Sequence, residues 1–333
     1  MFRHRFRLHV APALRTVAAT AIALTALPGT SAEAAYPERP ITVLVPFPAG
    51  GINDTIARPV LQKLGEALGA DIIVENKPGA SGMIGSSQAA RAKPDGYTLL
   101  LGAASTLAVV PQMNATAGYD PLIDLTPVGG IASVASILVT GKPDRYPNLK
   151  AVHAAALARP GDMTYGSAGV GTSQHMQMAQ YNLQRGLSMM HVPYRGGAPA
   201  MTDLVGGQID LMMEPVATAL PQIRGSKVIP LAISQKTRSP LVPDVPTFEE
   251  AGLPQYIAST WFSLMAPAGT DPATVALLSD KLVQVLAAPE IVKNFEARGI
   301  QTMPLPAADM AAYLREEHAL WGKVIKEANI PTQ

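Results

Sequence analysis

The chain of 333 residues contains no cysteine, which excludes disulfides, thiolate metal sites and cysteine nucleophiles. Charged residues account for only 15% of the chain and aromatic residues for 5%, whereas 48% of the residues are hydrophobic. A chain of this composition can fill a sizeable core, and it lacks the high charge and low hydrophobicity of disordered proteins. Its length allows one large domain or two of ordinary size.

Histidine is also scarce, and beyond residue 35 the chain keeps only His153, His175, His191 and His318, with no H-x-x-x-H pattern. Metal sites are built from closely spaced His, Cys, Asp and Glu side chains, so we expect no metal. The glycine-rich segments lack the Lys-Ser/Thr that ends a P-loop, and no G-x-G-x-x-G follows a predicted strand. We therefore expect no nucleotide and no other cofactor.

Residues 1–35 have the pattern of a secretory signal peptide. Four arginines lie between residues 3 and 15, residues 17–27 are apolar, and Ala32-Glu33-Ala34 matches a cleavage signal. A twin-arginine pair is absent from this segment, so general secretion is the simpler interpretation. The mature protein is expected in the periplasm.

Removal of this segment takes away four of the 26 Lys and Arg residues and one of the 25 Asp and Glu residues, leaving a net charge of −2. A nearly neutral chain without a basic stripe argues against a nucleic-acid partner. No later stretch has the ~20 uninterrupted apolar residues that a membrane span needs.

One stretch near the start of the mature chain combines a strand, a loop and a helix. Residues 41–45 are β-branched and aliphatic, Ala49-Gly50-Gly51 opens a loop, and Asn53 and Asp54 are good helix N-caps. Apolar residues four apart then run from Ile56 to Leu68. Because uncapped amides and the helix dipole point at one spot, this arrangement predicts a site for a carboxylate or similar anion. Pro59 inside the helix would clash with the carbonyl of Thr55, which predicts a kink or a helix start near Arg58.

The same architecture recurs further along. Residues 163–165 form a predicted strand, Gly166–Ser173 is a loop of small and hydroxyl residues, and a helix follows over 174–183. Two such units in separate lobes could face each other across a cleft. We expect one domain over 36–140 together with 260–333, and a second over 141–259.

The remaining pattern alternates strands with helices and predicts an α/β fold. Predicted strands cover 41–45, 72–74, 97–101, 137–140, 163–165, 190–193, 208–213, 228–234, 259–265 and 300–303. The first predicted helix starts near residue 54 and runs to 68. Further predicted helices cover 84–91, 107–113, 150–158, 174–183, 198–205, 217–223, 272–286 and 307–328.

Several polar residues have more than one interpretation. A hydrolase would use Ser167 or Ser173 with His175, but no G-x-S-x-G elbow exists, and residues two apart on a helix diverge. We therefore place His175 on the helix surface or between the lobes. Glu214 ends a predicted strand, where α/β sheets bind ligands, and either accepts ligand hydrogen bonds or is an exposed charge. Glu317, on the last helix, is expected on a solvated face.

Short motifs recur in order along the whole mature chain: Pro46-Phe-Pro-Ala-Gly-Gly51 with Asp54 and Arg58, Val74-Glu-Asn-Lys-Pro-Gly79, Pro94-Asp-Gly-Tyr-Thr-Leu99, Gly171-Thr172 with His175, Val192-Pro-Tyr-Arg-Gly-Gly-Ala-Pro199, Gly206-Gly-Gln-Ile-Asp-Leu-Met212, Asp244-Val-Pro-Thr-Phe248 and Ala266-Pro-Ala-Gly-Thr270. Together they resemble the substrate-binding receptors of tripartite tricarboxylate transporters, often called Bug receptors.

This resemblance implies a two-lobed periplasmic-binding-protein fold of the Venus-flytrap, type II class with two interdomain crossovers. It implies that one carboxylate of a small organic acid, acidic amino acid or aromatic acid is held between the loops Phe47–Asp54 and Ser167–Ser173. The family usually has Asp where this chain has Glu214, and Ile52 replaces a small or polar residue. The candidate ligand-binding residues are Phe47, Ala49, Gly50, Gly51, Asn53, Asp54, Ser105, Thr106, Ser167, Gly171, Thr172, Ser173 and Glu214.

The sequence as a whole predicts a monomeric binding protein with no catalytic residues. Its expected partners are a small carboxylate and the membrane subunits of a transporter. Two alternatives stay open at this point: a periplasmic hydrolase or isomerase that uses Ser173 or His175, and a protein that presents its ligand to a sensor.

Overall fold

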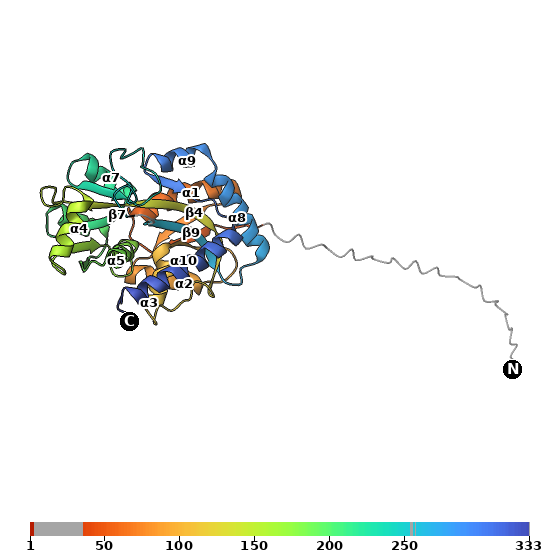
Figure 1. Cartoon of the computed structure of the whole chain (residues 1–333). Helices are drawn as coiled ribbons and strands as arrows, with labels where there is room; N and C mark the ends of the chain where they lie inside the picture. The colour runs from red at the N-terminus through yellow and green to blue at the C-terminus, as the bar shows by residue number, and fades with distance from the viewer. Residues whose placement is uncertain (3–35, 254–255, 257, 333) are drawn as a thin grey trace. The chain divides into compact units, whose positions relative to one another are not determined.

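The computed structural model describes residues 1–2, 36–253, 256 and 258–332 (Figure 1). The predicted signal peptide, apart from its first two residues, lies outside the described residues, and so does its cleavage signal. In the part of the chain that is described, no helix has the length and apolarity that crossing a membrane would require.

Ten strands of the described chain form one mixed sheet. The strands are β1 (Ile41–Val45), β2 (Ile72–Asn76), β3 (Thr98–Ala103), β4 (Leu125–Thr140), β5 (Thr164–Ser167), β6 (Met190–Pro193), β7 (Leu211–Pro215), β8 (Ile229–Ile233), β9 (Ser259–Pro267) and β10 (Ile300–Thr302). Their hydrogen-bonded order is β2-β1-β3-β9-β4-β7-β5-β6, and β10 and β8 also pair with β4. The neighbours β1–β2, β1–β3, β5–β6 and β5–β7 are parallel, while β4 and β9 run antiparallel to their partners. Each predicted strand overlaps an observed one.

The helices are α1 (Ile52–Leu68), α2 (Met83–Ala90), α3 (Val110–Met113), α4 (Leu149–Ala158), α5 (Ser173–Arg185), α6 (Gly197–Val205), α7 (Val216–Arg224), α8 (Pro272–Leu286), α9 (Pro289–Glu296) and α10 (Ala307–Glu327). A 3-10 turn, η1 (Ala80–Gly82), and a π-helical turn, η2 (Ser105–Val109), complete the set. The sequence analysis did not predict α9, a helix of only eight residues whose buried face is made by Ile291 and Phe295.

Strand β4 belongs to both halves of the sheet. Residues 125–135 pair with β9, and from Ser136 to Thr140 the strand pairs with β7 and β8. The chain returns between β8 and β9, so it passes between the two halves twice. The sequence predicted only the last four residues of β4, because Pro127, Gly129 and Gly130 interrupt the strand pattern. In the structure, the register shifts at these residues, and a Cβ on Gly130 would lie 2.6 Å from the carbonyl oxygen of Met303.

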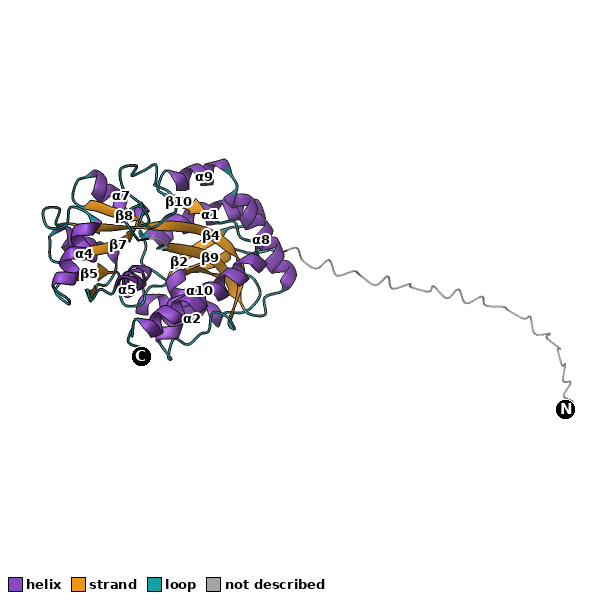
Figure 2. Cartoon of the chain, viewed as in Figure 1, coloured by secondary structure: helices purple, strands orange, loops and turns teal. Residues whose placement is uncertain are grey.

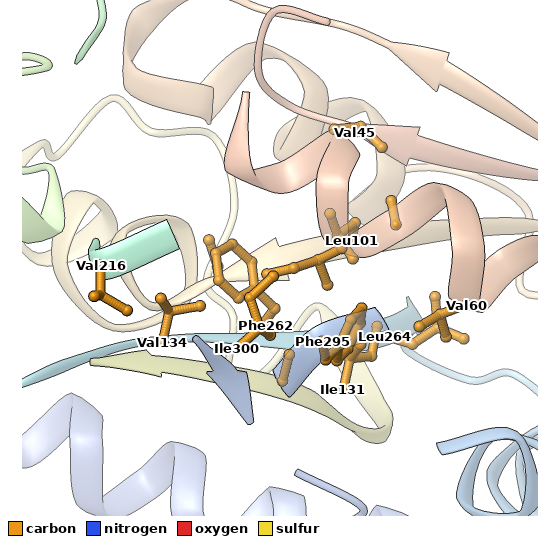
Figure 3. Close-up of a cluster of buried hydrophobic side chains, with 14 of the residues drawn as sticks. Val45, Val60, Leu101, Ile131, Val134, Val216, Phe262, Leu264, Phe295 and Ile300 are labelled. Carbon is orange, nitrogen blue, oxygen red and sulfur yellow. The ribbon is translucent and has the colours of Figure 1, made fainter. Parts of the chain in front are cut away.

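The largest hydrophobic cluster lies on one face of this sheet and continues across both halves. Figure 3 shows Val134 of β4 and Phe262 of β9 beside Val216 of α7 and Ile300 of β10. Figure 2 shows α1 and α9 on this side of β4 and β9, with α2 and α10 on the other. Burial of each such side chain stabilises the fold by roughly 1.5–3 kcal/mol.

Helix α1 begins at Ile52 and continues past Pro59, so the predicted helix start near Arg58 is wrong. A proline inside a helix costs about 3 kcal/mol because it removes one backbone hydrogen bond. The buried face of α1, which includes Ile56, Val60 and Leu64, more than offsets this cost.

Glu317 of α10, which the sequence placed on a solvated face, is only half exposed. Its carboxylate accepts hydrogen bonds from the indole nitrogens of Trp261 at 2.7 Å and Trp321 at 3.0 Å. Both tryptophans are buried, and they are the two tryptophans of the chain. This carboxylate therefore joins α10 to β9.

A buried carboxylate also holds together the strands around the end of β4. Asp210, 4% exposed, accepts hydrogen bonds from Lys142 Nζ at 2.7 Å, from Tyr146 and from the backbone amide of Thr164 at 2.9 Å. The backbone oxygen of Asp210 also accepts from the hydroxyl of Thr140. Burial acts to raise the pKa of this carboxyl, but the hydrogen bonds from Lys142 and Thr164 outweigh it and lower the pKa.

We expect Asp210→Ala to reduce the free energy of unfolding by about 2–4 kcal/mol, because it leaves buried donors without their acceptor. Since the pKa is lowered on folding, the contribution is present at neutral pH and is lost as the pH falls below the unfolded value of about 3.9. Urea denaturation at pH 7 and pH 3 measures both effects. Asp162→Ala is the matched control, because Asp162 forms only an exposed pair with Arg159. Equal losses in the two variants would contradict the prediction.

Candidate ligand-binding site

The loop between β1 and α1 is held in place by a buried carboxylate. One oxygen of Asp54 accepts hydrogen bonds from the amide of Gly50 at 2.8 Å and from Arg58 Nε at 3.2 Å. The other accepts from Asn76 Nδ2 at 2.9 Å, and the same nitrogen donates to the carbonyl of Phe47 at 3.0 Å. Asn76, at the end of the neighbouring strand β2, therefore fixes both ends of the loop.

Gly51 is the N-cap of α1, so the prediction that Asn53 or Asp54 caps this helix is wrong. Burial acts to raise the pKa of Asp54, but hydrogen bonds from Asn76, Gly50 and Arg58 lower it. Asp54 is therefore an anion that orients the loop. Asn53 lies in the first turn, 7% exposed, and its Oδ1 has no hydrogen-bond partner in the described chain.

Ser105 and Thr106 are both buried at the start of η2, immediately after β3. The hydroxyl of Thr106 bonds to the backbone of Ala103 at 3.1 Å. A Cβ on Gly82 would lie 2.6 Å from Cγ2 of Thr106 and 3.2 Å from the ring of Phe47, so this glycine, with φ +93°, lets the two segments approach. The first loop and η2 are thus neighbours.

The loop between β5 and α5 is tied to a pair of stacked histidines. The ring centroids of His175 and His191 are 3.9 Å apart. His191 Nε2 lies 2.7 Å from Ser167 Oγ, and His175 Nδ1 accepts from the amide of Gly171 at 3.1 Å. The hydroxyl of Thr172, the N-cap of α5, donates to the carbonyl of Gly169 at 2.7 Å.

His175 is buried, 6% exposed, so a position on the helix surface is wrong. Its ring stacks on that of His191 in strand β6. Burial lowers the pKa of His175 to about 3, with His191 adding to the effect, and burial lowers the pKa of His191 to about 4. Of the two serines that a hydrolase would use, Ser167 lies within hydrogen-bond distance of a histidine, His191, and Ser167 is fully buried.

Glu214, in β7, is 5% exposed, so its interpretation as an exposed strand-end charge is wrong. It accepts hydrogen bonds from Gln174 Nε2 at 3.0 Å and from the hydroxyl of Thr218. Gln174 Oε1 in turn accepts from the amide of Ala168 at 3.3 Å. Burial raises the pKa of Glu214 to about 7, although the hydrogen bonds from Thr218 and Gln174 act to lower it.

The second loop also touches the first half of the sheet. The hydroxyl of Ser81, in η1, donates to the carbonyl of Val170 at 3.1 Å. A Cβ on Gly171 would lie 3.1 Å from Cγ2 of Val110 in α3. The candidate residues therefore form two clusters, one around Asp54 and one around Glu214 and His191. The contacts of the second loop with Ser81 and Val110 join the two halves of the sheet next to these clusters.

Both helices that follow these loops have first-turn amides outside the backbone hydrogen-bond ladder. In the described chain, the helical ladder of α1 starts with the amide of Thr55 bonded to Gly51, and that of α5 with Met176 bonded to Thr172. The amides that precede Thr55 in α1 and Met176 in α5 belong to the first turn, where a helix offers no backbone acceptor. The helix dipole makes this N-terminal end positive.

Sequence reasoning missed four residues that hold the loops: Asn76, Gln174, His191 and Thr218. Asn76 carried a usable signal, because a polar residue directly ending a strand lies beside the end of its parallel neighbour. Gln174 and Thr218 had none, since each acts through a contact that only the tertiary structure creates.

No group of three or more His, Cys, Asp or Glu residues in the described chain is placed to hold a metal ion. One cavity of about 270 Å³ lies beside Ile52 and Thr55 of α1 and is also lined by α7. A larger hollow of about 860 Å³, between residues 37–40 and the second half of α1, includes none of the candidate residues.

Residues 56–330 match the family model of the tripartite tricarboxylate transporter family receptor. The chain is also 36% identical over 293 residues to the protein BugT of Bordetella pertussis, covering 88% of this chain and 90% of that one. This chain belongs to the tripartite tricarboxylate transporter receptor family.

Solved structures agree with this assignment. The periplasmic binding protein BugD is 31% identical, with a TM-score of 0.81, covering 90% of this chain and 100% of that one. Rpa4515 of R. palustris, solved with adipate, is 31% identical, with a TM-score of 0.83, and covers 89% of this chain and 99% of that one. The receptor therefore has the two-lobed α/β periplasmic-binding-protein fold, as the resemblance implied, and members of its family are binding proteins.

The stacked histidines of this receptor predict a pH dependence. Their pKa values in the folded state lie below the unfolded value of about 6.5, so the unfolded chain binds protons first. Stability should therefore fall as the pH drops from about 6.5 through 4. We expect His191→Phe, which keeps the stacking but cannot bind a proton, to flatten this slope in urea denaturation. An NMR titration midpoint of His191 near 6.5 would contradict the prediction.

Proposed function

We propose that this receptor is exported to the periplasm, closes around a small carboxylate and delivers it to the membrane subunits of a transporter. The observation that carries the proposal is the pairing of two strand–loop–helix units, at α1 and at α5. Each loop is held by buried polar groups, and each helix begins with amides that lie outside its backbone ladder. Such helix starts bind anions.

The small residues of both loops support the same ligand chemistry. Ala49, Gly50 and Gly51 are exposed and leave the backbone of the first loop open to a ligand. On the other side, Ser173 is half-buried in the first turn of α5. Glu214 has a pKa near 7, so it opposes an anionic ligand less than an ordinary carboxylate would.

Closure would be a hinge motion of two lobes, one made of residues 36–140 and 260–333, the other of 141–259. The exchange of partners along β4, between Ala135 and Ser136, supports a hinge close to the first boundary. Contacts of the ligand with both lobes would shift the balance between open and closed forms. We propose that the receptor acts as a monomer and has no catalytic activity.

The hydrolase and isomerase alternative has little support. Ser173 and His175 make no hydrogen bond to each other in the described chain, and the neutral ring of His175 already accepts from Gly171. A role in presenting the ligand to a sensor would use the same cleft and the same binding chemistry.

A panel of acids tests the proposed ligand class. Purified receptor would be melted with mono-, di- and tricarboxylates, acidic amino acids and aromatic acids, and with uncharged sugars as the comparison. A ligand at 100 times its Kd should stabilise the receptor by roughly 2.7 kcal/mol, which appears as a higher melting temperature. The proposal is wrong if no carboxylate raises the melting temperature while a sugar does.

The hydroxyl of Thr172 offers a test of the second loop. Thr172→Val removes the bond to Gly169 and a polar group at the start of α5, so we expect carboxylate binding to weaken by about 1–3 kcal/mol. Thr202→Val is the matched control, because the exposed hydroxyl of Thr202 bonds only within α6. Calorimetric titration of the acid that gives the largest melting shift measures the difference. Equal affinity of both variants would remove Thr172 from the site.

A further inference from the structure

Glu214 is a buried carboxylate that no cation accompanies in the described chain. It is 5% exposed, and no Lys, Arg or His nitrogen of the described residues lies within 4.0 Å of its oxygens. Its donors are neutral: Gln174 Nε2 lies 3.0 Å from one oxygen, and the hydroxyl of Thr218 contacts the other. A buried carboxyl with such donors can exist with or without its proton, in contrast to Asp54, which Arg58 helps to keep ionised.

The contacts of Thr218 allow Glu214 to carry a proton. The hydroxyl of Thr218 has one proton and two acceptors within reach, the carboxylate of Glu214 and the carbonyl of Pro215 at 3.0 Å. When Glu214 is ionised, the hydroxyl donates to it. When that oxygen of Glu214 is protonated, it donates to the hydroxyl, and the hydroxyl donates to Pro215. Gln174 donates to the other oxygen in both states. Neither state therefore leaves the carboxyl group or the hydroxyl without a partner.

The same carboxyl group lies next to the loop that is proposed to hold the ligand anion. Gln174, in the first turn of α5, donates to Glu214 with its amide nitrogen and accepts from the amide of Ala168 at 3.3 Å with its oxygen. A Cβ on Gly197, the first residue of α6, would lie 3.8 Å from Glu214 Oε1, so the start of α6 also adjoins it. An anion bound at the start of α5 would be separated from Glu214 by one side chain. Two negative charges this close in a buried site favour protonation of one of them.

In the described chain, no other ionisable group accounts for the protonation state of Glu214. Strands β4 and β7 carry no further ionisable residue. Burial raises the pKa of Glu214 to about 7, and the hydrogen bonds from Thr218 and Gln174 act to lower it, with no contribution from a charged side chain. The ionisable residues on the neighbouring elements are Tyr165 of β5, His175, Tyr181 and Arg185 of α5, Arg195 before α6, Asp203 of α6, Arg224 of α7, and Asp54 and Arg58 of α1.

We propose that Glu214 takes up one proton from the solvent when the receptor binds an anionic ligand, and returns it when the ligand leaves. The inference rests on the proposed function, because it needs an anion beside the second loop. By linkage, the anion favours the protonated form and the protonated form favours the anion by the same factor. The affinity should therefore rise as the pH falls through the pKa of the free receptor's Glu214, and level off below it. Capture is tighter in a mildly acidic medium.

Calorimetric titration in buffers of different ionisation enthalpy counts the protons taken up per ligand bound. The probes are aspartate, glutarate and benzoate, together with the acid of the panel that gives the largest melting shift. We expect the native receptor to take up roughly 0.5–1 proton at pH 8. Its Kd should increase by up to about tenfold per pH unit above pH 7, because one proton is linked to binding.

Two variants and a control assign the proton to Glu214. Glu214→Gln cannot bind a proton, so it should show no uptake and a Kd that is constant between pH 6.5 and 8.5. Glu249→Gln is the control, because Glu249 is exposed, and it should keep the native proton count. Thr218→Val is the second variant, which keeps the test open if Glu214→Gln does not fold. Since the hydroxyl of Thr218 acts to lower the pKa of Glu214, its loss should move the pH dependence of Kd to higher pH.

The outcomes separate this inference from the carboxylate proposal. If the native receptor binds an acid without taking up a proton, or if Glu214→Gln keeps the uptake, the inference is wrong while the carboxylate proposal stands. An unchanged pH profile of Thr218→Val would overturn it in the same way. If no acid of the panel binds to the native receptor, both proposals are wrong.

Discussion

The continuous hydrogen bonding of β4 is the constraint on which the rest of the structure depends. One strand pairs with β9 over residues 125–135 and with β7 and β8 over Ser136–Thr140, so both half-sheets are built on the same backbone. Each residue of the strand has only two soft backbone dihedrals, so the strand holds the two halves in a defined relation. Its hydrogen-bonding partners can change at one point along its length. Asp210 and Glu317 reinforce the strands on either side of that point with partly buried hydrogen bonds.

Each of the two loops proposed to bind the ligand is held by a polar residue from a neighbouring strand. Asn76 from β2 holds the loop after β1, His191 from β6 holds the loop after β5, and Glu214 from β7 orients Gln174 beneath the same loop. Parallel strands bring their carboxyl ends to one edge of the sheet, and this is why residues far apart in sequence meet there. The loops themselves contribute mostly backbone, which a rigid support can orient toward an anion.

The two buried carboxylates of the proposed site have pKa values shifted in opposite directions, for a physical reason. Asp54 receives donors from Asn76, Gly50 and Arg58, which outweigh the cost of burial and keep it ionised. Glu214 receives two neutral donors, and burial prevails. The charge of Asp54 is met by the donors from Asn76, Gly50 and Arg58, and Glu214, with its raised pKa, opposes an anionic ligand less than an ordinary carboxylate would. The local hydrogen bonds, rather than the residue type, decide which carboxylate carries charge.

The sequence by itself determined the order of strands and helices, the two strand–loop–helix units and the family, because hydrophobic periodicity and turn residues act over short distances. Only the tertiary structure decided the extent of β4, whose prolines and glycines hide the strand pattern, and the passage of α1 through Pro59, where burial outweighs a lost hydrogen bond. The same holds for the burial of His175 and Glu214 and for the contacts of Glu317 with the two tryptophans. Their environments come from strands and helices distant in sequence, and no local pattern encodes such contacts.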